Sequence, residues 1–283
     1  MHFGRLGESG REIPVAFLHG QYHDLRPITA DIDGSFLAGD PAGAVTAHLA
    51  ELPELADASA LRMGAPVARP GAVYCIGMNY AAHAREGGQE PPERIVVFMK
   101  PPHTVAGPDD RFPLPAGARK VDWEAELAVV IGARAWQIED PETALGHVAG
   151  YTVANDISER EWQLELSGGQ WSKGKGGPGF CPLGPWLVTA DSLDPGDLRV
   201  QSFVNGEPRQ DSRTSDMIFD VGQIVADLSH YTVLEPGDVI LTGTPEGVAF
   251  SGRFPYLAAG DVVEIEIEHL GRQRQDVAGR ADR

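Results

Sequence analysis

Two glutamates in one short segment, Glu124 and Glu126, have the residue type and spacing to bind a metal ion. Apolar residues alternate with acidic ones from residue 121 and then continue unbroken to residue 131, which predicts a β-strand. Residues two apart in a strand project from the same face, so the two carboxylates lie side by side. Such carboxylates repel each other unless a cation lies between them, and their hard oxygen atoms suit Mg²⁺, Mn²⁺ or Ca²⁺.

A solvated strand face is the alternative interpretation of this pair. The glutamates of residues 264–268 also alternate with apolar residues, and we expect them to lie on the surface. The row that carries Glu124 and Glu126 differs, because it continues through Ala128 and Val130. That continuation indicates a strand face that enters a core.

Asp156 is a candidate third metal ligand. Residues 151–155 have the composition of a strand, and Ser158 with Glu161 has the spacing of a capping box that opens a helix. Asp156 is therefore predicted at a strand-to-helix junction, where the backbone holds a carboxylate firmly. Because Ser158 already supplies the cap, an N-cap role for Asp156 is less favoured.

A histidine and a glutamate three residues apart, His83 and Glu86, could act as an acid–base pair. Residues 80–86 suit a helical turn, which places both side chains on one face. A carboxylate beside an imidazole orients the ring and raises its basicity, as a general base requires. A surface His–Glu contact is the alternative. The following residues 87–92 are acidic and rich in glycine and proline, which predicts a mobile loop that could act as a lid.

Two loops carry weaker signals. Residues 169–176 resemble a phosphate-binding loop, but Gly176 stands where that motif needs serine or threonine, and residues 161–166 predict a helix where a strand is required. We therefore reject nucleotide binding. Thr244 lies between glycines after a predicted buried strand, so this loop could offer N–H groups and a hydroxyl to a ligand carboxylate. A plain turn explains the same residues.

The elements that must position these side chains belong to an acidic chain of globular composition. Its 283 residues predict about two domains. The net charge of −18 argues against a nucleic acid or an anionic membrane as a partner. Cys75 and Cys181 form neither a disulfide framework nor a metal-ligand pair, which favours a reducing compartment. We see no signal-peptide core and no apolar run of membrane-spanning length, so a cytoplasmic location is expected.

The domain boundary is predicted near residue 70. Residues 1–69 read as a small domain of short strands and one helix, ending in a proline- and alanine-rich linker, and a structural cap is its simplest role. Residues 70–283 carry every candidate site residue. The predicted elements are strands at 13–19, 22–28, 72–77, 95–100, 121–131, 151–155, 186–189, 198–204 and 239–242, helices at 43–52, 80–86 and 217–229, and a hairpin turn at Asn205-Gly206.

Six ordered segments give the chain a family resemblance. They are Gly77-Met78-Asn79-Tyr80 with His83 and Glu86, Trp123-Glu124 with Glu126-Leu127, Asn155-Asp156 with Ser158 and Arg160, Lys175 with Phe180 and Pro182-Leu183-Gly184-Pro185, Ser215-Asp216-Met217-Ile218-Phe219, and Gly237-Asp238-Val239-Ile240-Leu241-Thr242-Gly243-Thr244-Pro245. Over about residues 70–270 the sequence resembles the fumarylacetoacetate hydrolase family. Six motifs in one order are more specific than any one of them. Residues 168–175 look closest to members that act on 2,4-diketo-3-deoxy sugar acids, and other branches share parts of this stretch. The chain as a whole resembles the short bacterial type, which includes these hydrolases and the acylpyruvases.

The resemblance implies a fold, a quaternary state and roles for the site residues. The implied fold is α+β and mainly β, a mixed β-sandwich roll with flanking helices, here preceded by a small N-terminal α+β domain, and the implied quaternary state is a homodimer. The implied site consists of one Mg²⁺ or Mn²⁺ on Glu124, Glu126 and Asp156, the acid–base pair His83 and Glu86, the catalytic Lys175, and the substrate-binding Arg160, Gln163 and Thr244.

The implied activity is metal-dependent cleavage of a carbon–carbon bond in a 2,4-dioxo acid. Isomerase, decarboxylase or lyase chemistry on a related 2-oxo acid uses the same constellation, because a fold does not determine a reaction. A ligand-binding homologue without activity is the non-enzymatic alternative. It is favoured by one departure from the family, the residues Gly176-Gly177-Pro178-Gly179 after Lys175, where members usually carry polar groups. These glycines predict a pliable segment after Lys175, without the polar groups that would anchor it.

Overall fold

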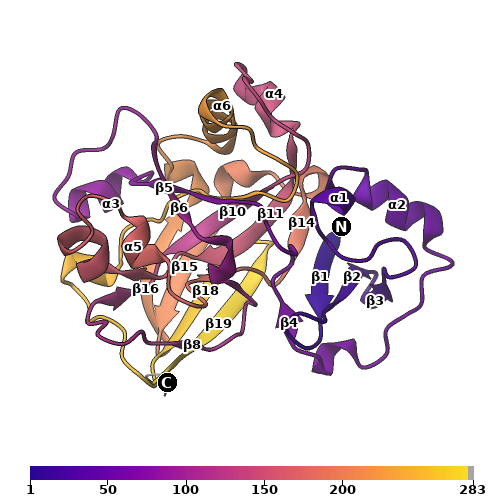
Figure 1. Ribbon diagram of the computed structural model, residues 1–283, viewed down its shortest axis with the longest axis horizontal. Helices are drawn as coiled ribbons and strands as arrows, with labels where there is room; N and C mark the ends of the chain where they lie inside the picture. The colour runs from indigo at the N-terminus through magenta and orange to yellow at the C-terminus, as the bar shows by residue number, and fades with distance from the viewer. Residues whose placement is uncertain (280–283) are drawn as a thin grey trace.

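The computed structural model describes residues 1–279, and the chain is mainly β (Figure 1). The largest sheet has ten strands: β1 His2–Leu6, β2 Ile13–Leu18, β3 Gln21–Asp24, β4 Met63–Gly64, β5 Val73–Gly77, β6 Val96–Lys100, β10 Ala125–Ile131, β11 Val148–Asn155, β14 Leu187–Thr189 and β17 Val239–Leu241. Its order is β3-β2-β1-β14-β11-β10-β17-β5-β6, with β4 paired to β1. The β5–β17 pair is parallel and its neighbours β6 and β10 pair antiparallel, so the sheet is mixed.

A second sheet has five strands in the order β16-β15-β18-β19-β8. They are β8 Phe112–Pro113, β15 Arg199–Val204, β16 Glu207–Arg213, β18 Val262–Ile267 and β19 Gly271–Ala278. Two short pairs complete the strands, namely β7 Val105–Ala106 with β13 Cys181–Pro182 and β9 Val121–Asp122 with β12 Ser158–Glu159. Between β15 and β16 the predicted hairpin turn is confirmed, because Asn205 and Gly206 have φ values of 55° and 79°, as a type I′ turn requires.

The helices are short and lie around the sheets (Figure 1). The α-helices are α1 Gly34–Leu37, α2 Pro41–His48, α3 Ala81–Glu86, α4 Pro141–Leu145, α5 Ser172–Lys175 and α6 Val221–Tyr231. The 3-10 turns are η1 Ala58–Ala60, η2 Pro102–Thr104, η4 Ala190–Ser192, η5 Pro195–Asp197, η6 Thr214–Asp216 and η7 Ala249–Ser251, and η3 Glu161–Glu165 is a π-helix. Among the described residues, no helix combines the length and apolar character needed to cross a membrane.

Strand β10 separates two cores. Its odd-numbered residues, such as Leu127 and Val129, pack in a core with Val263 and Ile265 of the five-stranded sheet. Its even-numbered residues Ala128 and Val130 belong to a second core on the other face. Because side chains alternate along a strand, Glu126 projects on the side of this second core, as its row in the sequence predicted.

The second core joins the N-terminal residues to the rest of the chain. It contains Phe3 and Val45 together with Val130, Leu187 and Leu241, all of them fully buried. The sheet is also continuous across the predicted boundary, since β1 pairs with β14 as well as with β2. The division at residue 70 stays a prediction, and the two parts share both a sheet and a core.

Several predicted elements have other bounds in the structure. The strand predicted at 22–28 is β3 and ends at Asp24, and the strand predicted at 151–155 is β11 and begins at Val148. Residues 121–131 form two strands, because β9 leaves the large sheet to pair with β12 before β10 begins. The helix predicted at 217–229 is α6 and begins at Val221, where Asp220 caps it with a hydrogen bond from the N–H of Gln223. The helix predicted at 43–52 is α2, which begins earlier, at Pro41, and ends at His48.

The helix predicted after Ser158 also needs correction. Ser158 lies in β12, and its hydroxyl donates to the carbonyl of Asp156 rather than accepting from a helix N–H. The Glu159 carboxylate accepts from the N–H of Trp162 at 2.6 Å instead. The capping box predicted for Ser158 and Glu161 is therefore wrong, and the segment that follows is the π-helix η3.

Candidate active site

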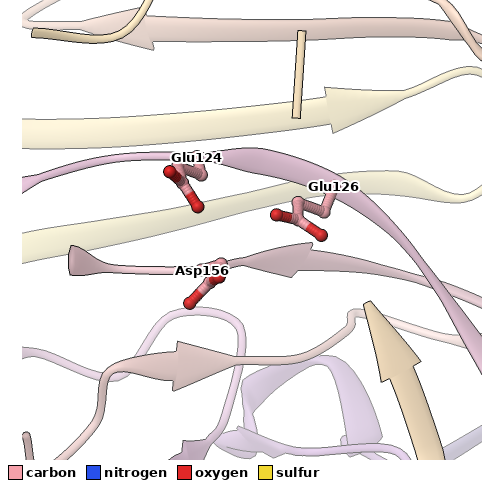
Figure 2. A group of neighbouring side chains, drawn as sticks. All are labelled: Glu124, Glu126 and Asp156. Atoms are coloured by element: carbon pink, nitrogen blue, oxygen red, sulfur yellow. The ribbon is translucent and has the colours of Figure 1, made fainter. Parts of the chain in front are cut away.

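Three carboxylates, those of Glu124, Glu126 and Asp156, lie close together in the interior of the protein (Figure 2). One oxygen of each lies within 4.8 Å of the others. Strand pairing explains the convergence. Ala125 is paired with Asn155, and the N–H of Asp156 donates to the carbonyl of Glu124 at 2.9 Å. Three buried carboxylate oxygens at this spacing match the hard donor set that a divalent cation prefers.

Three buried cations surround these carboxylates. Lys175 Nζ donates to Glu124 Oε2 at 2.7 Å and to Asp156 Oδ2 at 2.6 Å. Arg160 Nη1 lies 2.6 Å from Glu124 Oε1. Lys100 Nζ donates to Asp156 Oδ1 at 2.5 Å and to the carbonyl of Ile157 at 3.0 Å. The charges of Glu124 and Asp156 are thus compensated, as buried charges require, whereas Glu126, among the residues that the structure describes, accepts only from the backbone N–H of Gly243.

These contacts set the protonation of the site. Burial disfavours the charged form of Glu124, but Arg160 and Lys175 outweigh it and hold its pKa well below the usual range. Burial raises the pKa of Glu126 well above its usual value, and the charges of Asp156 and Glu124 raise it further. Burial alone would lower the pKa of Lys175, whereas Asp156 and Glu124 raise it. Glu126 is thus the carboxylate that most lacks a positive partner.

His83 and Glu86 lie on α3, and His83 lines a cavity together with Glu124 and Glu126. His83 Nδ1 is 3.7 Å from Glu86 Oε2, longer than a hydrogen bond, and within residues 1–279 that nitrogen has no hydrogen-bond partner. Glu86 is held by the N–H of Gly247, at 3.0 and 3.2 Å from its two oxygens. Burial opposes its ionisation, but His83 and Gly247 outweigh it and lower the pKa of Glu86. A charged Glu86 therefore lies beside the imidazole of His83.

The candidate substrate-binding residues also line this cavity. Arg160, Gln163 and Thr244 are all buried there. Nη2 of Arg160 is buried without a hydrogen-bond partner in the described part of the chain. The hydroxyl of Thr244 is engaged inside the protein, since it donates to the carbonyl of Ala125 and accepts from Gln210. An orphaned buried donor such as Arg160 Nη2 is the kind of group that a ligand oxygen satisfies.

The glycine-rich loop around Thr244 does offer N–H groups to carboxylates, but to those of the protein itself. The N–H of Gly243 donates to Glu126 Oε2 at 2.7 Å, and that of Gly247 donates to Glu86. The loop thereby holds one residue of the candidate metal site and one of the acid–base pair. Thr244 and Gln163 stay predictions as ligand contacts.

Sequence reasoning missed two buried charged residues, Lys100 and Asp122. The sequence does contain an indication of each. Lys100 ends an otherwise apolar strand, and Asp122 lies two residues before Glu124, just as Glu124 lies two residues before Glu126. Asp122 accepts from Arg160 Nε at 2.8 Å and from two N–H groups of the η7 turn. It therefore fixes the arginine and one cavity wall together.

Lys175 is positioned by close packing of α5 on η3. A Cβ atom added at Gly174 would lie 2.4 Å from the carbonyl oxygen of Glu159 and 2.5 Å from Cβ of Gln163. Such a distance leaves no room for any residue but glycine. The side chain of Lys175 is buried in spite of the glycines that follow it. Packing on η3, rather than polar groups in residues 176–179, thus anchors the lysine.

A comparison of sequences identifies the family. The sequence profile described as fumarylacetoacetate (FAA) hydrolase C-terminal matches residues 72–278. The chain belongs to this family. The resemblance predicted from the six motifs is therefore confirmed. The mainly β architecture agrees with that of solved members, whereas the details of a sandwich roll and of a separate N-terminal domain stay predictions.

Named relatives of this hydrolase-family chain catalyse different reactions. It is 43% identical to a 2,4-didehydro-3-deoxy-L-rhamnonate hydrolase of Sphingomonas sp. over 98% of this chain and 96% of that protein. It is 48% identical to a mitochondrial oxaloacetate tautomerase of Bos taurus over 73% of this chain and 66% of that protein. The crystal structure of a Sphingobium sp. maleylpyruvate hydrolase with manganese(II) and pyruvate is 28% identical, with a TM-score of 0.81 and coverage of 99% and 100%.

Proposed function

We propose that this protein is a divalent-metal-dependent hydrolase that cleaves a carbon–carbon bond in a 2,4-dioxo acid, an acylpyruvate or a 2,4-diketo-3-deoxy sugar acid, to give pyruvate and a second acid. The carrying observation is one cavity lined by Glu124, Glu126, His83, Lys175 and Arg160. It combines a carboxylate cluster suited to a cation with a base and two positive side chains. The relatives named as hydrolases support the reaction class.

The donor set fits Mg²⁺ or Mn²⁺, with Ca²⁺ also possible. Glu124, Glu126 and Asp156 would hold the ion through oxygen atoms alone. Once bound, the ion would supply Lewis-acid polarisation of a 2-oxo carboxylate. Burial first, and then the charges of Asp156 and Glu124, raise the pKa of Glu126; a cation between the carboxylates would stabilise its charged form, which supports this assignment.

The charges of the site favour an anionic ligand. Four buried carboxylates and three buried cations meet there, which leaves −1 when all are ionised. They are Asp122, Glu124, Glu126, Asp156, Lys100, Lys175 and Arg160. A divalent cation brings the total to +1, and a carboxylate ligand neutralises it.

The side chains of the chain would carry the proton and charge transfers. His83, with Glu86 charged beside it, takes a proton from water, and the hydroxide oxygen bonds to the C4 carbonyl carbon. The C3–C4 bond then breaks, its electron pair passes to C3 as the enolate of pyruvate, and a proton returns to C3. Lys175 and the free Nη2 of Arg160 stabilise the negative oxygens as charge develops.

The test uses metal-free protein, prepared with a chelator, and acetylpyruvate. Addition of Mn²⁺ or Mg²⁺ should start the release of pyruvate and acetate in equal amounts. Metal-loaded protein that releases neither product from acetylpyruvate nor from longer dioxo acids would refute the hydrolase.

Tautomerisation is the second candidate function, favoured by the 48% identity to the bovine oxaloacetate tautomerase. His83 could move a proton between C3 and an enol oxygen without any attack by water, so the same residues would serve. Faster interconversion of enol and keto oxaloacetate, without pyruvate from acetylpyruvate, would establish this alternative.

A ligand-binding homologue without activity would give a third result, namely binding of metal and oxalate in calorimetry without either reaction.

The homodimer and the cytoplasmic location belong to the same proposal. Both cysteines of the described chain are free and buried, which supports a reducing compartment. Strand β6 at the edge of the large sheet exposes Val97 and Met99, each 43% accessible, and such apolar edge positions suit contact with a second copy. Light scattering should give twice the chain mass of 30.3 kDa.

A further inference from the structure

We infer that part of the active-site wall is an apolar subsite for the substrate tail, so the preferred acid carries an alkyl tail rather than a hydroxylated one. The apolar side chains of this wall are those of Met78, Phe98, Leu164, Trp171 and Phe250. The inference rests on the proposed function, since it takes a 2-oxo acid head to lie at the carboxylates and cations.

The apolar wall begins directly beside the groups that would bind the head. The ring of Phe98 lies 4.9 Å from Lys175 Nζ, and the ring of Phe250 lies 5.5 Å from Arg160 Cζ. A ligand whose carboxylate and oxo groups face the two cations therefore meets these rings with its next carbons. Polar tail atoms there would lose water without gaining hydrogen bonds from the rings.

The rings are fixed before any ligand arrives. Trp171 packs against the backbone of Gly77 so closely that a Cβ there would lie 2.5 Å from its ring, and its ring centroid lies 5.6 Å from that of Phe98 in an edge-to-face contact. The backbone N–H of Phe250 donates to Asp122 Oδ2 at 2.9 Å, which holds the backbone that carries this ring, and the ring itself lies against Arg160. A preorganised apolar surface gains affinity from each methylene that it covers, because little ordering is needed on binding.

Leu164 adds a side chain that would be covered on binding. It lies on the π-helix η3, lines the cavity and is 38% exposed. Gln89 is a polar side chain that lines the same cavity, and it is not among the groups assigned to the head, so it is a group through which a hydroxylated tail would be recognised instead. A contact with Leu164 would therefore favour an alkyl tail, whereas a contact with Gln89 would favour a hydroxylated tail.

The test measures binding, so it does not depend on turnover. Calorimetry on Mn²⁺-loaded protein compares 2-oxobutanoate, 2-oxopentanoate and 2-oxohexanoate with the 6-hydroxy derivative of the last. Affinity should rise about fourfold with each methylene until the subsite is filled. The terminal hydroxyl should weaken binding about fivefold or more relative to the alkyl acid of the same length.

Two leucines that lie close in the sequence, Leu164 and Leu166, provide the variants and their control. Leu164→Asn should flatten the rise with chain length, while Leu164→Met should keep it. Leu166→Asn is the control, since Leu166 is 63% exposed and, within the described chain, lies outside this cavity wall. All three variants should bind Mn²⁺ like the wild type, which shows that the site is folded.

Equal affinity for all the acids would overturn the inference. So would tighter binding of the hydroxylated acid that is lost in Gln89→Ala. These outcomes are separate from failure of the proposed reaction. An alkyl preference without cleavage of any dioxo acid would refute the hydrolase and leave the subsite, whereas cleavage without the preference would refute the subsite alone.

Discussion

At the scale of single residues, the three carboxylates allow the sharpest test of metal binding. Glu124→Gln and Asp156→Asn each remove a charge and a hard ligand, so we expect Mn²⁺ affinity to fall at least about tenfold. Glu266→Gln is the matched control, because Glu266 alternates along β18 as the glutamates of the site do but is part-exposed at the surface. Calorimetry and elemental analysis measure the result. Unchanged metal content in both site variants would exclude the assignment.

His83 is expected to contribute to the rate but not to metal binding. Its imidazole lines the cavity beside Glu86, and His83 does not belong to the group of three residues that could hold the metal ion. His83→Ala should therefore keep Mn²⁺ and lower turnover of a dioxo acid by about two orders of magnitude, the usual size of a general acid–base contribution. The comparison is kcat for variant and wild type at saturating substrate. Near-normal turnover in the folded variant would remove His83 from the mechanism.

The residues that the sequence revealed and those that it did not differ in a physical way. Glu124, Glu126 and Asp156 could be found because strand alternation and one junction place their carboxylates. Lys100 contacts Asp156, which lies 56 positions away in the sequence, and the sequence of its own strand does not indicate which carboxylate will be its partner. Long-range ion pairs of this kind depend on tertiary packing alone.

At the scale of elements, the packing of α5 on η3 makes a specific prediction. Gly174→Ala would favour the helix by intrinsic propensity, but the new Cβ would collide with the carbonyl oxygen of Glu159 at 2.4 Å. We expect α5 to shift, displacing Lys175 and lowering both the thermal midpoint and the affinity for oxalate. Because overpacking typically costs about 1–3 kcal/mol, the loss of stability should be measurable by denaturant unfolding.

Gly176→Ala is the control for that variant. It lies two residues further on, and its added Cβ would meet no atom of the described chain closer than 3.4 Å. Its stability and oxalate affinity should match those of the wild type. Equal effects of the two substitutions would mean that flexibility of residues 176–179, rather than the contact at Gly174, controls the lysine.

The elements themselves were predictable to different degrees. Strand β6 and helix α3 agree with their predicted ranges within a residue, because each has a simple pattern and a proline or glycine boundary. The helix predicted after Ser158 was wrong, because β12 pairs with β9 and this pairing overrides the local capping signal. The pair joins Ser158 to Asp122, which are 36 residues apart in the sequence. Tertiary hydrogen bonds, rather than local propensity, determine the secondary structure of this segment.

At the scale of the whole molecule, the N-terminal residues do more than their sequence suggested. Their short strands carry no candidate chemistry, and a structural cap was the expectation. The structure shows β1 between β2 and β14 in one continuous sheet, and Phe3, Val45 and Leu187 in one core. The sequence does not disclose this sharing, because both parts have the composition of separate domains.

This shared core predicts what happens when residues 1–69 are removed. The remaining chain would lose the strand that pairs with β14 at Leu187, a fully buried residue in one core with Phe3, and β14 would become an edge strand of the sheet. Exposed apolar strands at a sheet edge favour aggregation, so we expect a truncated protein that does not give a cooperative melt or bind Mn²⁺. In the full chain, Phe3→Ala should keep Mn²⁺ binding but lower the free energy of unfolding by about 3–5 kcal/mol. A soluble, cooperatively folded chain from residue 70 that binds Mn²⁺ like the intact protein would show instead that the N-terminal part is a dispensable cap.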